Sequence, residues 1–153
     1  ELPSAMVGSL SYGDTVLVEQ FVEGMEVAVT VIDGPDGPEA LPAVQIEPAS
    51  GVYDYTARYT AGLTSYRTPA ELSPEAARAA GELAVSAHQL LGLRDVSRTD
   101  MIVDRHGTPH FLEVNVSPGL TETSLLPMAV EASGRSLGEV FAGLVERAIE
   151  RSA

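Results

Sequence analysis

The sequence contains no cysteine, no lysine and no tryptophan, and the first two absences exclude whole classes of site and partner. Without cysteine the chain can form neither a disulfide framework nor a thiolate metal site, which fits a reducing cytoplasm. The nine basic residues are all arginine, against 22 acidic residues, and the net charge is -13. No basic stripe is therefore available for a nucleic acid backbone. No apolar run approaches the length of a membrane span, so we expect neither nucleic acid nor a membrane as a partner.

What is present is the composition of an ordinary globular protein. The chain has 153 residues, of which 44% are hydrophobic, with 14 glycines and 10 prolines spread along its length. A chain this long removes roughly 70% of its unfolded surface from water and can build one core. An acidic surface suits a soluble protein, and acidic side chains that gather at one place suit a divalent cation.

The first half of the chain has the pattern of short strands followed by a long loop. Residues 15–20 and 26–33 are rich in β-branched side chains and predict a pair of strands. The glycine- and proline-rich residues 34–38 predict a turn, and residues 41–47 a third antiparallel strand. From residue 48 to residue 69 the periodicity fades while tyrosine and glycine increase, which predicts a long loop with a role in packing or function.

The second half begins with a well-marked helix. Ser73 has the character of an N-cap, Pro74 stands at the first helical position, and Gly92 ends the helix. The buried stripe that we expect on this helix comprises Ala80, Leu83, Ala87, Leu90 and Leu91. Residues 125–133 and 136–151 predict two further helices, separated by Gly134. The fold class that follows is α+β, an antiparallel sheet with helices packed on it.

Polar residues of two neighbouring strands carry the chemistry. Residues 96–103 and 109–116 predict a hairpin with His106-Gly107 as a two-residue turn. In that register Arg98 lies opposite Asn115, and Asp100 lies opposite Glu113. Because side chains alternate along a strand, all four point to one face. The other face is mostly core material: Thr99, Met101, Val103, Leu112 and Val114.

Two opposed carboxylates need a counter-charge. At about 5 Å and an effective dielectric near 20, the repulsion between Asp100 and Glu113 is on the order of 3 kcal/mol. Arg98 offsets part of it, but the oxygens of Asp, Glu and Asn are also the ligands that Mg²⁺ prefers. The alternative is a solvated polar face with no ligand. Four polar groups in register favour the ion site.

The segment that follows the hairpin suits an anion. Residues 116–124 are rich in glycine and hydroxyl groups and run into a helix N-terminus, where free backbone N–H groups and the helix dipole attract negative charge. The alternative is that Thr123 or Ser124 only caps the helix. The position of this segment directly after Asn115 favours a functional role.

Several blocks of sequence together resemble the D-alanine-D-alanine ligases. They occur in that family's order and spacing and span nearly the whole chain: Val18–Val27, Tyr53–Tyr59, Arg98–Asp100, Phe111–Asn115 and Ser117–Pro127. The resemblance implies the C-terminal domain of an ATP-grasp ligase. Such an enzyme activates one D-alanine as an acyl phosphate with ATP, and a second D-alanine then attacks to form the dipeptide for peptidoglycan in the cytoplasm.

The resemblance also implies roles for individual residues. Asp100, Glu113 and Asn115 would hold two magnesium ions, with manganese as an alternative, while Arg98 and the backbone N–H of Gly119 would stabilise negative charge on the reacting phosphate. The remaining contacts would come from Ser124 to the substrate carboxylate, Tyr59 on the loop over the substrates, Glu19, Phe21 and Val22 around the adenine, and Glu26 to the ribose hydroxyls. Arg58 stands where the family usually has a phosphate-binding lysine, which keeps the charge but changes its geometry.

The resemblance divides the chain into three parts. Residues 1–50 would end the small ATP-binding subdomain, residues 51–70 would form the substrate-covering loop, and residues 71–153 would form the C-terminal metal- and ATP-binding subdomain. The family's N-terminal substrate domain and its glycine-rich phosphate loop would lie upstream of Glu1, so we expect this polypeptide alone to be inactive.

Other interpretations stay open. The chain could be a non-catalytic remnant that only binds nucleotide, or a related ligase that uses another acceptor such as D-serine or D-lactate. For the full-length enzyme a homodimer is an alternative to a monomer.

Overall fold

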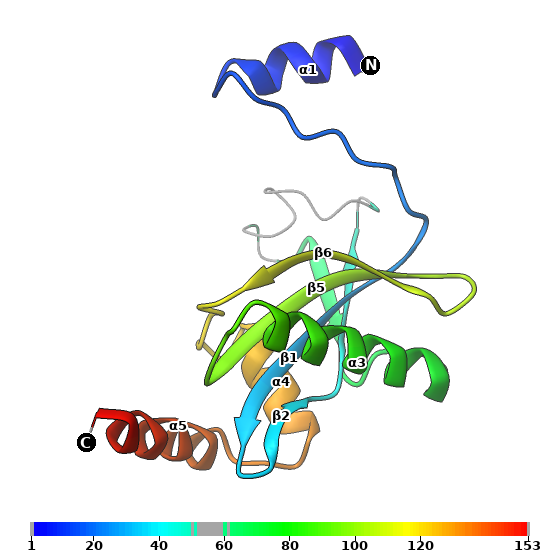
Figure 1. The fold of residues 1–153 in the computed structure, drawn as a ribbon. Helices are drawn as coiled ribbons and strands as arrows, with labels where there is room; N and C mark the ends of the chain where they lie inside the picture. The colour runs from blue at the N-terminus through cyan, green and yellow to red at the C-terminus, as the bar shows by residue number, and fades with distance from the viewer. Residues whose placement is uncertain (1, 50, 52–59, 61, 153) are drawn as a thin grey trace.

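A six-stranded antiparallel sheet lies at the centre of the computed structural model, which describes residues 2–49, 51, 60 and 62–152 (Figure 1). Five strands follow one another across the sheet in the order β4-β3-β1-β5-β6. Strand β2 pairs with the C-terminal end of β1, beyond the part of β1 that pairs with β3. The strands are β1 (Gly24–Gly34), β2 (Gly37–Ala40), β3 (Val44–Pro48), β4 (Thr64–Arg67), β5 (Val96–Asp104) and β6 (Pro109–Asn115). The helices are α1 (Leu2–Leu10), α3 (Pro74–Leu90), α4 (Leu125–Ala132) and α5 (Leu137–Ser152). The α+β class is confirmed.

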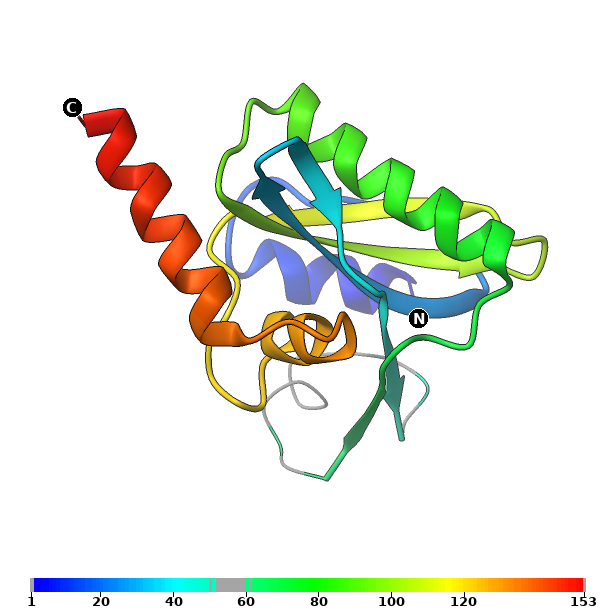
Figure 2. The same ribbon diagram turned by 90° about the horizontal axis from the view of Figure 1, so that it is seen from below.

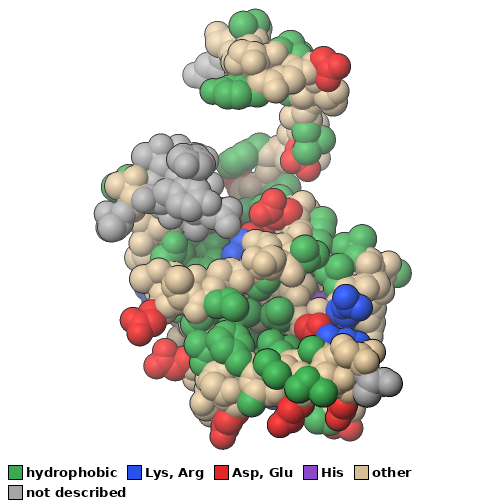
Figure 3. Space-filling view, turned by 90° about the vertical axis from the view of Figure 1, so that its left-hand side faces the viewer, with side chains coloured by type: hydrophobic (Ala, Val, Ile, Leu, Met, Phe, Trp, Pro, Cys, Tyr) green, Lys and Arg blue, Asp and Glu red, His purple; other side chains and the backbone are tan. Residues whose placement is uncertain are grey.

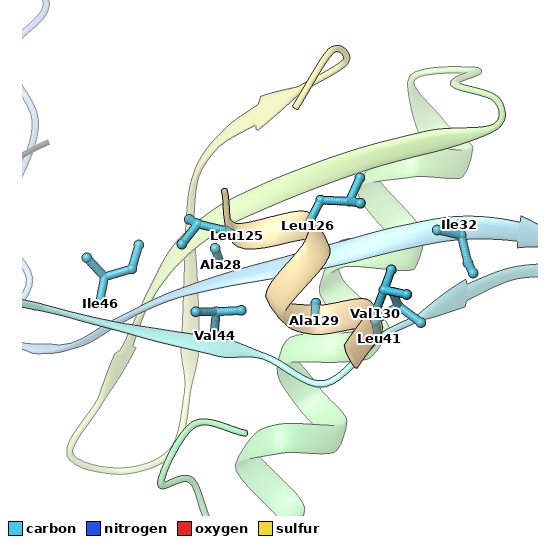
Figure 4. Close-up of a cluster of buried hydrophobic side chains, with 9 residues drawn as sticks. All are labelled: Ala28, Ile32, Leu41, Val44, Ile46, Leu125, Leu126, Ala129 and Val130. Atoms are coloured by element: carbon cyan, nitrogen blue, oxygen red, sulfur yellow. The ribbon is translucent and has the colours of Figure 1, made fainter. Parts of the chain in front are cut away.

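Strand β1 is buried on both faces and holds two hydrophobic cores apart. Its residues Val27, Val29 and Val31 face α3, whereas Ala28 and Ile32 face α4 (Figures 2 and 4). Because neighbouring side chains of a strand point to opposite faces, one apolar run contributes to both cores. The sheet is therefore packed between α3 on one side and α4 with the start of α5 on the other.

Helix α3 begins as predicted but presents a different face to the sheet. The Ser73 side chain accepts a hydrogen bond from the Ala76 backbone N–H at 3.2 Å, which confirms the N-cap. The buried residues are Ala76, Ala80, Ala84 and His88, one per turn. The prediction that Leu90 and Leu91 are buried is wrong, since Leu90 is 86% exposed and Leu91 is exposed as well. Small side chains on the inner face let the helix pack closely on the sheet, and the two last leucines are exposed at the end of the helix.

A buried polar group connects α3 to the sheet beside the candidate site. The His88 Nδ1 atom lies 2.8 Å from the Ser97 hydroxyl, and its Nε2 atom lies 3.5 Å from a carboxylate oxygen of Asp33. These contacts join α3 to β5 and to the end of β1. They hold the residue that immediately precedes Arg98.

Two predictions about the first half are wrong. Residues 15–20 are not a strand but part of an irregular segment, and within the described chain no strand pairs with them. A β-branched sequence needs a neighbouring strand to complete its hydrogen bonds. The segment predicted as a loop contains β4, which pairs with β3 so that Tyr66 lies opposite Ile46. Residues 26–33 and 41–47 are confirmed as strand-forming, although β3 begins only at Val44.

Helix α1, which the sequence patterns did not predict, stands away from the sheet (Figures 1 and 3). It contributes no buried residue, and its apolar side chains are exposed: Leu2, Met6, Val7 and Leu10. Helices α4 and α5 confirm the two predicted C-terminal helices, with Gly134 in a left-handed conformation between them (φ 75°). Among the described helices none has the length and apolar character needed to cross a membrane.

The core assignment predicts opposite outcomes for two leucine truncations. Leu126 is 1% exposed in the core beneath α4, so Leu126→Ala should destabilise the protein by about 2–5 kcal/mol because it leaves a cavity. Leu90→Ala is the matched control and should cost under about 0.5 kcal/mol. Urea unfolding of both variants measures the difference, and equal losses would contradict the assignment.

Candidate functional site

The register of β5 against β6 brings the four predicted polar residues to one face. Arg98 pairs with Asn115, and Asp100 pairs with Glu113. Arg98 and Asp100 are buried, Asn115 is half-buried and Glu113 is exposed. The exposure of the four side chains therefore increases from β5 to β6, so that a ligand can reach the site from the β6 side.

The register changes by one residue just beyond the site. After the pair of Asp100 and Glu113, Met101 pairs with Phe111, and Leu112 is left without a partner residue opposite it. This is a β-bulge. Leu112 is exposed and lines a cleft on the site face instead of contributing to the core as predicted. The bulge lies on the turn side of the polar residues, so their own pairing keeps the predicted register.

The turn of the hairpin differs from the prediction for the same reason. The Asp104 backbone N–H donates to the Thr108 carbonyl at 3.0 Å, which leaves three residues, 105–107, in the turn, and Gly107 adopts a left-handed conformation with φ 81°. The Asp104 carboxylate accepts hydrogen bonds from the backbone N–H groups of His106 and Thr108 at 2.8 and 3.0 Å. The pKa of the Asp104 carboxyl is lowered to about 2, chiefly by the hydrogen bond to the His110 ring and further by these backbone N–H groups. The turn is one residue longer than predicted, and the bulge leaves one residue of β6 without a partner. The two differences cancel, so the polar residues keep the predicted pairing.

Arg98 neutralises Asp100 through two parallel hydrogen bonds. The Nε and Nη2 atoms of Arg98 lie 2.7 Å from Oδ1 and Oδ2 of Asp100. Arg98 is 5% exposed and Asp100 8%. A buried carboxylate requires such a partner, because removal from water is costly for an unpaired charge. Part of the repulsion that the sequence predicts between Asp100 and Glu113 is therefore offset by Arg98.

The oxygen donors fit a hard divalent cation. Within the described ranges no three Asp, Glu, His or Cys side chains come together as a metal site by themselves. A cation at this face would therefore use the carboxamide oxygen of Asn115 in addition to the carboxylates of Asp100 and Glu113. That oxygen also accepts a hydrogen bond from the Ser117 backbone N–H at 2.9 Å, which fixes its orientation.

The segment after β6 returns to the same face of the sheet. It ends at Ser124, the N-cap of α4, and α4 packs on Ala28, which pairs with Asp100 (Figure 4). The Ser124 side chain makes no capping hydrogen bond to the helix; its hydroxyl lies 2.8 Å from that of Thr121. A Cβ atom at Gly119 would approach the Ser124 hydroxyl to 2.6 Å. The structure thus brings Gly119 and Ser124 together, and the interpretation of Ser124 as a side-chain cap does not hold.

A cleft of about 540 Å³ lies beside the polar face. It is lined by three of the residues predicted for nucleotide binding, Phe21, Val22 and Glu26, whereas Glu19 lies upstream in the exposed segment and is not part of its lining. Sequence reasoning missed the apolar residues that line it from three other strands: Ile46, Ile102 and Leu112. Alternation along β5 places Ile102 on the face of Arg98 and Asp100, and that signal could have found it. The bulge that turns Leu112 toward the cleft leaves no comparable mark in the sequence.

Glu26 links the cleft to the polar face electrostatically. Burial raises the pKa of the Glu26 carboxyl from 4.5 to about 7, and the negative charge of Asp100 adds to the rise. Glu26 lies opposite Ile102, two residues along β5 from Asp100 and on the same face, so the cleft lies next to the predicted cation site. Two other predicted residues, Arg58 and Tyr59, lie outside the described residues.

Comparisons with known proteins agree on one family. Residues 1–147 match the family described as "D-ala D-ala ligase C-terminus". The D-alanine–D-alanine ligase of Pelotomaculum thermopropionicum is 41% identical over 150 residues, which are 98% of this chain and 47% of that protein. The ligase of the same name from Anaeromyxobacter sp. strain K is 44% identical over 153 residues, again 47% of its length. The chain spans about half the length of the curated relatives it matches.

Solved structures show the same fold. The D-alanine–D-alanine ligase of Bacillus anthracis superposes with a TM-score of 0.79 at 27% identity, over 100% of this chain and 50% of that one. The VanG D-Ala:D-Ser ligase of Enterococcus faecalis has a TM-score of 0.79 at 33% identity, over 95% and 42%.

The raised pKa of Glu26 predicts a stability that falls with pH. Between 4.5 and about 7 the folded protein retains a proton on Glu26 that the unfolded chain releases, so the free energy of unfolding decreases as pH rises through this window. Glu26→Gln should therefore melt roughly 2–4 °C above the parent protein at pH 8, an effect of about 1 kcal/mol, and should lose this advantage at pH 4.5. Scanning calorimetry at the two pH values, with the exposed Glu23→Gln as control, measures the effect. A constant difference between Glu26→Gln and the parent at both pH values would contradict it.

Proposed function

Because the chain belongs to the D-alanine-D-alanine ligase C-terminal family, we propose that it is the ATP- and magnesium-binding part of a ligase that joins two D-alanine molecules for peptidoglycan through an acyl phosphate. The observation that carries the proposal is the position of the cleft, which Glu26 and Ile102 line, next to the polar residues of β5 and β6 on the same face of the sheet. A cleft with several apolar side chains, next to a row of oxygen donors and an arginine, suits a nucleotide whose phosphates are held by a metal ion.

The cleft would hold the base and sugar of ATP. Ile46, Ile102 and Leu112 offer apolar surface for a planar base, and Phe21 and Val22 lie on the segment beside them. Glu26 would accept hydrogen bonds from the ribose hydroxyls. Phe21 is 80% exposed, so it has room to move onto a bound base. Contacts from Glu19 to the adenine, from Arg58 to phosphate and from Tyr59 to the substrates are proposed from the family alone.

Asp100, Glu113 and Asn115 would hold two magnesium ions, or manganese in their place. A bound divalent ion would supply Lewis-acid neutralisation of the phosphate oxygens. The protein's own contribution is the rigid spacing of the donors, which two paired strands fix before any ligand arrives. Such preorganisation lowers the reorganisation that a reacting phosphate would otherwise require.

Arg98, Gly119 and Ser124 would orient the reacting groups. The guanidinium of Arg98 is always charged and presents a planar fork to anionic oxygens. The backbone N–H of Gly119 would donate to negative charge that develops on the acyl phosphate. Ser124, whose hydroxyl is not used to cap α4, would contact the substrate carboxylate. Catalysis of this kind depends on positioning and charge neutralisation.

Ligation should require more than this polypeptide. We propose that residues 1–50, 51–70 and 71–153 correspond to the end of the small ATP-binding subdomain, the substrate-covering loop and the C-terminal metal-binding subdomain. Groups for the first D-alanine and the glycine-rich phosphate loop would come from the part of the ligase that corresponds to the other half of the relatives.

One alternative keeps the chemistry and changes the acceptor. The structural similarity to the VanG D-Ala:D-Ser ligase, at 33% identity, supports D-serine as a second candidate for the attacking amine. The other alternative is a module that binds nucleotide without catalysis.

Nucleotide binding should depend on the exposed carboxylate of the site. The protein should bind Mg-ATP at millimolar concentration in a calorimetric titration, and Glu113→Gln should weaken that binding at least tenfold because one oxygen donor loses its charge. Since Glu113 is exposed, the melting temperature in metal-free buffer should not fall. Glu146→Gln on α5 is a control of the same charge change. Undetectable binding by the parent protein, or equal binding by Glu113→Gln, would contradict the proposal.

The ligation activity can be tested in a fusion protein. The chain joined to the preceding half of the Pelotomaculum thermopropionicum ligase, with which it shares 41% identity, should form D-alanyl-D-alanine from D-alanine and ATP, detected by mass spectrometry. Supplying D-serine or D-lactate as competing acceptors identifies the preferred one. A folded fusion that binds Mg-ATP but forms no product with any acceptor would identify the binding module instead.

A further inference from the structure

Arg98 and Asp100 are bound to each other, although the proposed function gives them different ligands. Asp100 is proposed to hold a cation and Arg98 to bind an anion. In the structure both oxygens of Asp100 accept from the two nitrogens of Arg98 at 2.7 Å. The pair closes between residues two apart on one strand, on the face that also carries Glu113 and Asn115. Each group therefore occupies the partner position that a ligand would take.

We propose that the Arg98–Asp100 ion pair is a latch that a divalent cation opens. Arg98 occupies both oxygens of Asp100 until the ion arrives, and the ion then displaces the guanidinium from Asp100 toward an anionic oxygen. The inference rests on the proposed function and adds an order of events to it. The cation binds to Asp100 first, and Arg98 then binds the anion.

Burial makes the latch necessary. Asp100 is buried and lies across from Ala28, on which α4 packs. A carboxylate there without a counter-charge would destabilise the folded protein. A positively charged partner must therefore be present at all times, and Arg98 is the partner built into the fold. A divalent ion on the same carboxylate repels the guanidinium, so the two cations compete.

After it leaves Asp100, the guanidinium of Arg98 would bind an anion on the same face of the sheet. Asn115 lies directly opposite Arg98, and the segment with Gly119 and Ser124 starts from there and returns to the sheet at α4. An arginine that leaves Asp100 therefore remains next to Asn115, where the segment with the donors proposed for negative charge begins. Cation binding and anion binding become positively coupled, and the coupling is reciprocal.

The competition predicts that removal of Arg98 tightens cation binding. In buffer without nucleotide, Arg98→Met should bind Mn²⁺ at least tenfold more tightly than the parent protein, measured by the loss of the free-ion signal in electron paramagnetic resonance. Arg98→Lys, whose single ammonium cannot hold both oxygens in parallel, should lie between the two. Arg135→Met is the matched control, because Arg135 also holds both oxygens of a carboxylate, that of Glu39, at a more exposed position away from the site. Its affinity for Mn²⁺ should equal that of the parent.

A measurement on the parent protein keeps the proposal testable if Arg98→Met does not fold. The Arg98 Nε–H signal in a nitrogen-15 spectrum should exchange slowly with solvent in metal-free buffer and faster as Mg²⁺ is added. The Arg135 signal should not change. An Arg98 signal that stays equally protected at saturating Mg²⁺ would overturn the latch.

The outcomes separate the latch from the site beneath it. Mn²⁺ binding that is measurable but equal in the parent and Arg98→Met, or weaker in the variant, overturns the latch and leaves the metal site in place. Absence of Mn²⁺ binding in every variant overturns both the latch and the proposed metal site. Tighter binding in Arg98→Met, with Arg135→Met unchanged, supports the latch.

Discussion

The pairing register of β5 against β6 is the constraint on which the rest of the site depends. Because side chains alternate strictly along a strand, a slip of one residue would send half of the polar groups into the core that faces α3. The bulge at Leu112 shows how narrowly the register is kept. It absorbs the extra residue on the turn side of Asp100, so that the polar pairs stay opposite each other while the turn takes the length it needs.

The rest of the fold holds that register in place. Every residue of β5 pairs with β1, which is itself buried between two cores, so the hairpin has a rigid neighbour on one side. His88 and Ser97 add a polar connection from α3 immediately before Arg98. On the other face, α4 covers Ala28 and brings the end of the segment with Gly119 back to the sheet. The cleft beside Glu26 opens at the end of the sheet that α4 leaves uncovered.

The features that depend on neighbouring residues in the sequence were predicted correctly. The N-cap at Ser73, the end of α4 near Gly134 and the opposition of Asp100 and Glu113 follow from residue type and spacing, and all three are present. Features that depend on partners distant in sequence were wrong. Residues 15–20 have the composition of a strand but no described neighbour to pair with, and the buried face of α3 was set by small residues that fit the sheet rather than by its leucines. The orientation of Leu112 toward the cleft depends on the bulge, which the period of two does not reveal.

The site proposed on β5 and β6 stands on the binding of divalent cations by the oxygen donors of its polar face. Its most direct test is to locate Mn²⁺ by the paramagnetic broadening of backbone amide signals in a nitrogen-15 spectrum. Broadening should be greatest at Asp100, Glu113 and Asn115 and should decrease toward the hairpin turn. Broadening centred on Asp104, His106 and His110 at the turn, or on the acidic residues of α5, would contradict it.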